Sequence, residues 1–65
     1  MSDLNLEPNI PDPDGFYADL LNAHEQLSDE QSHALNARLV LILANHVGDR
    51  SILRDALEAA RGEHA

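Results

Sequence analysis

Residues 27–49 read LSDEQSHALNARLVLILANHVGD, and this stretch decides the fold. Ser28 and Gln31 form a capping box, because the serine oxygen can accept the Gln31 amide while the glutamine side chain returns to the Ser28 amide. Apolar residues then recur at helical spacing as far as Gly48, which tolerates the positive φ that follows a helix end. The pattern therefore predicts a long central helix over residues 29–47.

The middle of this helix is apolar on every side. Residues 39–44 read LVLILA, and six consecutive residues at about 100° each pass completely around a helix. Either the rest of the chain surrounds the helix, or one face stays open and binds a second subunit or another protein. In so short a chain we favour the open face. The predicted interface residues are Leu39, Val40, Leu41, Ala44 and Val47, together with Leu4 and Leu6.

Two further helices flank the central one. Asp12 can cap a helix whose first residue is a proline, and apolar residues continue its pattern, which predicts a first helix over residues 13–27. Asp49 can cap a third helix over residues 50–61. Because the connections are short, we expect one all-α domain of three helices, two long and antiparallel and the third shorter.

Residues 1–12 are expected to form an extended arm. Prolines at positions 8, 11 and 13 remove backbone donors and disfavour helical geometry in the residues before them. Leu4, Leu6 and Ile10 alternate with polar residues. The arm can therefore lie in a groove between helices or on a partner.

Length and composition limit how the chain gains stability. A domain of 65 residues buries only about 60% of the surface that its unfolded chain exposes. With no cysteine, it has neither disulfides nor thiolate metal sites, so helix packing and association remain. Nothing resembles a secretory signal or a membrane span, and a soluble cytoplasmic protein is expected.

The charge of the chain is strongly acidic and unevenly distributed. Twelve acidic residues against four arginines and no lysine give a formal net charge of −8, which argues against direct binding of nucleic acid. Residues 1–30 contain eight of the acids and no arginine. We interpret this half as a solubilising surface, with an acidic inhibitor of a basic surface as an alternative function.

Polar residues flank the apolar run of the central helix. They are expected to form a structural cluster and not a site. Arg38 would pair with a carboxylate of the first helix or the arm, because buried polar groups need partners. The others would satisfy the backbone at the end of the central helix. The complete cluster is Arg38, Asn45, His46 and Asp49.

No pattern in the sequence indicates catalysis. The serines occupy cap or first-turn positions and the glycines are isolated, so neither a nucleophile nor a phosphate-binding loop is predicted. Glu30 and His33 have the spacing found in di-iron carboxylate bundles. A metal-binding protein of paired chains is therefore an alternative, although the helix dipole already explains acids in a first turn. We predict no catalytic residue and no cofactor.

Two blocks of the chain resemble a small bacterial family of helical proteins of unknown function. They are residues 27–49 and the opening NLEPNIPDPDGFY at residues 5–17. Members of that family are associated with genes for flavin-dependent aromatic monooxygenases, and the resemblance implies an accessory subunit of such an enzyme. Together with the apolar run, it predicts a non-catalytic protein–protein interaction module that forms a homodimer or binds a larger catabolic enzyme.

Overall fold

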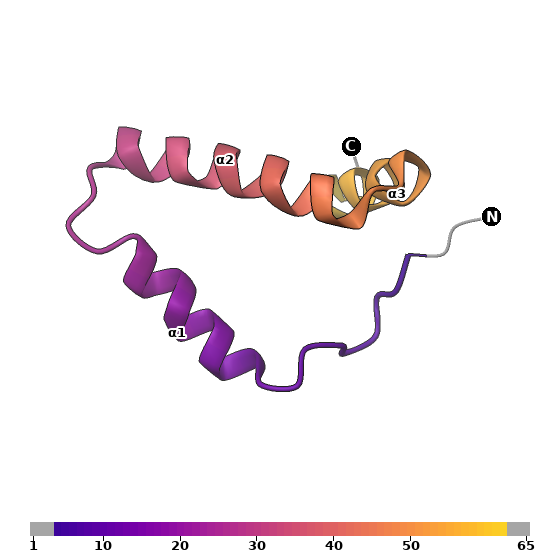
Figure 1. The fold of residues 1–65 in the computed structure, drawn as a ribbon, viewed down its shortest axis with the longest axis horizontal. Coiled ribbons are helices and arrows are strands. Elements are labelled where there is room, and N and C mark those ends of the chain that lie inside the picture. The colour runs from indigo at the N-terminus through magenta and orange to yellow at the C-terminus, as the bar shows by residue number, and fades with distance from the viewer. Residues whose placement is uncertain (1–3, 63–65) are drawn as a thin grey trace.

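A computed structural model describes residues 4–62. These residues form three helices, α1 (Pro13–Ala23), α2 (Asp29–Val47) and α3 (Arg50–Arg61), and contain no strand (Figure 1). The prediction of an all-α fold is confirmed. No helix in this part of the chain combines the length and hydrophobicity that a membrane crossing requires.

Each helix begins at a side chain that caps it. Asp12 accepts the amide three residues later, at 3.1 Å. At the start of α2, Ser28 Oγ accepts the Gln31 amide at 3.1 Å and the Gln31 side chain accepts the Ser28 amide at 2.9 Å. Asp49 accepts the amides two and three residues later, at 2.9 and 3.2 Å. These bonds satisfy donors that have no partner within the helix, so each helix carries its own start signal.

The first helix ends earlier than the sequence pattern predicts. It was expected to continue to Leu27, but it ends at Ala23. The His24 amide bonds to the Leu21 carbonyl at 3.0 Å, which tightens the last turn. Gln26 then adopts a φ of 64°, in the left-handed region that breaks a helix. As a result α1 has 11 residues and α3 has 12, so the third helix is not the shortest.

Residues 24–28 form an elbow between α1 and α2, and His24 holds it. Its Nδ1 lies 2.8 Å from Ser32 Oγ, and its Nε2 lies 3.2 Å from Asn36 Oδ1. Ser32 and Asn36 are four residues apart, which places them on the same face of α2. Within residues 4–62, these are the side-chain hydrogen bonds that join two helices. They keep α1 close to α2 at the elbow.

Beyond the elbow, α1 and α2 separate. Figure 1 shows the two helices diverging toward their far ends, with α3 turning away at the end of α2. The radius of gyration is 13.7 Å, whereas a compact domain of this length has about 11 Å. The helices therefore do not pack along their whole length.

This divergence leaves the chain without a core. None of residues 4–62 is buried. The accessible surface is 5913 Å², whereas a compact monomer of this mass exposes about 4,100 Å². The difference, about 1,800 Å², is surface that a folded domain normally hides.

Gly48, which ends α2, is expected to resist substitution because of its backbone conformation. Its φ is 72°, and its amide bonds to the Ala44 carbonyl at 2.9 Å. A Cβ at this position would meet only the Asn45 carbonyl oxygen, at an ordinary 3.8 Å. Gly48→Ala should therefore lower the free energy of unfolding by about 1 kcal/mol through φ alone.

Thermal unfolding followed by circular dichroism measures this effect, and D-alanine in a synthetic chain is the control. D-Alanine favours positive φ, so it should not destabilise the chain. Equal destabilisation by both enantiomers would mean that crowding, and not φ, sets the cost.

The His24 hydrogen bonds should appear as an energetic coupling between the helices. In a double-mutant cycle of His24→Ala and Ser32→Ala, we expect a coupling of about 0.5–1.5 kcal/mol in the free energy of unfolding. Urea unfolding at a pH where histidine is neutral measures it. His46→Ala is the control, because His46 is exposed and makes no side-chain hydrogen bond within residues 4–62. A coupling no larger than that between His46→Ala and Ser32→Ala would contradict a clamping role for His24.

Candidate interaction surface

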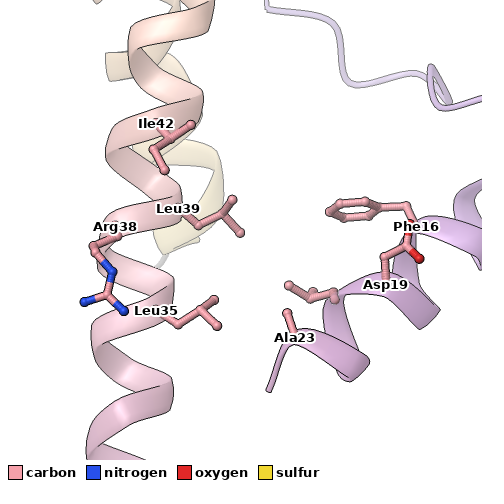
Figure 2. A pocket seen from close by; sticks show the side chains of 8 residues that line it. Phe16, Asp19, Ala23, Leu35, Arg38, Leu39 and Ile42 are labelled. Carbon is pink, nitrogen blue, oxygen red and sulfur yellow. The ribbon is translucent and has the colours of Figure 1, made fainter. Parts of the chain in front are cut away.

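A groove of about 290 Å³ lies between α1 and α2. Figure 2 shows apolar side chains reaching toward one another from the two helices. Each wall is a stripe of three residues at i, i+4 and i+7, the spacing that places side chains on one helix face. The stripe on α1 is Phe16, Leu20 and Ala23, and the stripe on α2 is Leu35, Leu39 and Ile42.

The groove is narrow near the elbow and open at its far end. Leu20, Leu35 and Leu39 are half-buried. Phe16 and Ile42, one turn farther from the elbow, are exposed, and Ile42 keeps 65% of its surface accessible. The exposure follows the divergence of the helices, so the walls contact each other only partially.

The charged residues of the groove lie at its edge. Asp19 and Arg38 complete the lining, and Figure 2 shows the Arg38 guanidinium turned away from the α1 wall. Neither side chain makes an ion pair or a hydrogen bond with another residue in the range 4–62. Small-molecule sites combine a volume of about 300–1,000 Å³ with convergent polar groups. The groove lacks such convergence, and its walls are apolar.

The most exposed apolar surface lies on the second half of α2. Leu41 is 70% accessible and Val40 is 59% accessible, and Leu43 and Val47 are also exposed. Of the predicted interface residues on α2, Leu39 and Ala44 are half-buried. Sequence reasoning did not place Ile42 and Leu43 on this surface, because it could not foresee how far α1 moves away from α2.

A second apolar stripe runs along α2, on the side away from the groove. We call it the outer stripe; it consists of Ala37, Val40, Ala44 and Val47. Its steps of three, four and three residues are the spacing of a helix–helix seam. At about 100° per residue, it lies about 150° around the helix from the groove wall of α2. No residue of the outer stripe lines the groove.

The arm does not fill the groove. Leu4 is half-buried, whereas Leu6 is 76% accessible. A hollow of about 430 Å³ on the arm is lined only by residues between Asn5 and Pro13, so α2 does not contribute to it. None of residues 4–12 lines the groove between α1 and α2.

The predicted polar cluster does not come together. Asp49 caps α3 and not the end of α2. Asn45 and His46 are exposed and make no side-chain hydrogen bond within residues 4–62. The end of α2 is closed by backbone geometry, through the amide of Gly48. Glycine at this position makes side-chain capping there unnecessary.

The structure also places the residues of the metal alternative. Glu30 and His33 lie in the first turns of α2 and are exposed. Within residues 4–62 of the single chain, no three histidine or acidic side chains are close enough to bind a metal ion together. The pair would therefore need ligands from outside residues 4–62 of the same chain.

Sequence reasoning did not single out His24, which bonds to Ser32 and Asn36 in the structure. The sequence feature that could have indicated this role lies on α2, where the polar residues Ser32 and Asn36 lie beside the apolar stripe that begins at Leu35. Two polar residues on a face that packs against α1 need hydrogen-bond partners. A polar residue at the end of α1 is the nearest candidate across a short elbow.

Comparison with known proteins identifies a family but no function. No curated protein and no solved structure matches the chain. Residues 4–62 match a family described as a protein of unknown function, DUF2783. The match includes the elbow, the groove and the outer stripe. The chain therefore belongs to the DUF2783 family.

Proposed function

We propose that this chain is a non-catalytic protein–protein interaction module that presents the second half of α2 to a protein partner. The absence of any buried residue between positions 4 and 62 carries the proposal. A domain this small depends on hiding apolar surface for its stability. A partner supplies the covering that the chain does not supply for itself.

The amount of exposed surface fits an interface. The excess over a compact monomer is about 1,800 Å², and a stable interface of standard size buries about 800 Å² on each partner. The excess is therefore larger than the area that one side of such an interface requires.

The arrangement of the exposed apolar residues also supports binding. Residues 40–43 are four consecutive apolar residues, and all are exposed. Successive side chains point about 100° apart, so these four surround one turn of α2, and exposed apolar surface of this extent is typical of an interaction site. The chain's charge of −8 keeps such a surface from associating indiscriminately.

The partner is either a second copy of the chain or a larger enzyme. The family resemblance described above favours, for the second case, a bacterial flavin-dependent aromatic monooxygenase, of which this chain would be an accessory subunit. Both partners would use the same exposed surface of α2. Substitutions on that surface can therefore test the proposed function before the partner is identified.

Leu41→Asp tests the proposal. Because Leu41 is 70% accessible in the isolated chain, the aspartate stays hydrated there and the helix content should be unchanged. Burying the charge in an interface costs several kcal/mol, so association should weaken by about 100-fold or more. Circular dichroism measures the helix content, and sedimentation equilibrium together with affinity capture from native lysate measures the association.

Leu57→Asp is the matched control. Leu57 lies on α3 and is 67% accessible, so the same substitution is made at nearly the same exposure on a different helix. It should leave association nearly unchanged. Unfolding caused by Leu41→Asp, or an equal loss of association in both variants, would overturn the proposed surface.

A further inference from the structure

We propose that the partner of α2 is a second copy of this chain, bound antiparallel through the outer stripe about a two-fold axis. The inference rests on the proposed function, because it names the partner of the same surface. In a two-fold dimer each copy contributes the same patch, so the patch must be complementary to itself. The size, shape and charge of α2 each bear on this requirement.

The exposed area is sufficient for a dimer. An excess of about 1,800 Å² on each of two copies amounts to about 3,600 Å² in total. Permanent homodimers bury about 2,000–5,000 Å² in total. The excess surface is therefore large enough for an interface of this class.

The outer stripe alternates small and larger side chains, and this alternation favours an antiparallel pair. In the antiparallel register that places Val40 opposite Ala44 of the second copy, Ala37 falls opposite Val47. Every alanine then faces a valine, which is how facing helices fill the space between them. A parallel pair would instead set alanine against alanine and valine against valine, leaving gaps and crowding in alternate layers.

The exposed half of α2 is also where this pair would meet. In the same register, the two copies of α2 overlap from Ala37 to Val47. This segment contains Val40 and Leu41, which α1 leaves exposed because it diverges from α2 beyond the elbow (Figure 1). The groove wall of α2 continues to face α1, whereas the outer stripe faces the second copy.

The charges favour the same orientation. Asp29 and Glu30 lie in the first turn of α2. In the antiparallel pair this turn extends past the end of the second copy's α2, where Arg50 begins the next helix. A parallel pair would place two acidic first turns side by side and add repulsion.

This arrangement is incompatible with a metal centre shared between two chains. In the proposed register, the two copies of His33 are separated by about 27 Å along the helix axis, at about 1.5 Å per residue. The Glu30–His33 pairs could converge only in a parallel dimer. A measurement of the dimer's orientation therefore distinguishes the antiparallel dimer from a metal centre shared between parallel chains.

Sedimentation equilibrium from about 1 to about 100 μM tests for the dimer, since the fraction of dimer depends on concentration. We expect a species of twice the chain mass of 7.1 kDa. Val40→Glu should weaken dimerisation by about 100-fold or more, because the pair would bury two carboxylates. Leu21→Glu, on an exposed position of α1, is the control and should leave the dissociation constant nearly unchanged.

Cysteine cross-linking tests the orientation. The chain contains no cysteine, so Ala37→Cys and Val47→Cys each introduce a single thiol. In a glutathione redox buffer, a mixture of the two variants should form a mixed disulfide. Neither variant alone should do so, because identical positions lie about 15 Å apart along the axis and a disulfide needs Cα atoms within about 7 Å. Disulfides formed as efficiently by each variant alone as by the mixture would overturn the antiparallel arrangement.

Failure of this inference can be distinguished from failure of the proposed function. A chain that stays monomeric throughout the concentration range overturns the dimer. If such a monomer still captures another protein at one-to-one stoichiometry, and Leu41→Asp abolishes the capture, then the interaction surface stands and only its partner is different. If Leu41→Asp changes neither self-association nor capture, both proposals fail.

Discussion

The structure depends on one constraint, which is that α2 is apolar all around its middle in a chain too short to surround it. The helix that could cover one side, α1, has only 11 residues. Because α1 also diverges from α2, it covers the face nearest the elbow and leaves the rest exposed. In most domains the hydrophobic effect drives apolar side chains into a core, whereas here most of the apolar surface of α2 stays in contact with water.

His24 determines which face of α2 is covered and which remains exposed. By bonding to Ser32 and Asn36, it directs α1 toward the stripe of α2 that contains Leu35 and Leu39. The outer stripe, about 150° around the helix, is then left free. A hydrogen-bonded contact at one end of the helix pair thus selects the surface that is available at the other end.

Local signals made the helices predictable from sequence, and long-range contacts limited the prediction of their arrangement. The capping box at Ser28 and the glycine at position 48 act within a few residues, and both bounds of α2 follow from them. The end of α1 depends on Gln26, whose left-handed backbone is part of an elbow held by contacts with α2. The exposure of Ile42 depends on the divergence of two helices, which no local pattern encodes. Val40 and Leu41 could be predicted because no orientation of α1 covers every side of α2.

The three capping side chains have a consequence for how this protein can change over evolutionary time. Asp12, Ser28 and Asp49 specify where the helices begin, and none of them belongs to the outer stripe or the groove. Mutations in the outer stripe therefore leave intact the side chains that start the helices. In most small domains the apolar residues form the core, so mutations of these residues strongly destabilise the fold. Here, the residues that specify where the helices begin and the residues of the outer stripe occupy separate positions, so each set can change independently over evolutionary time.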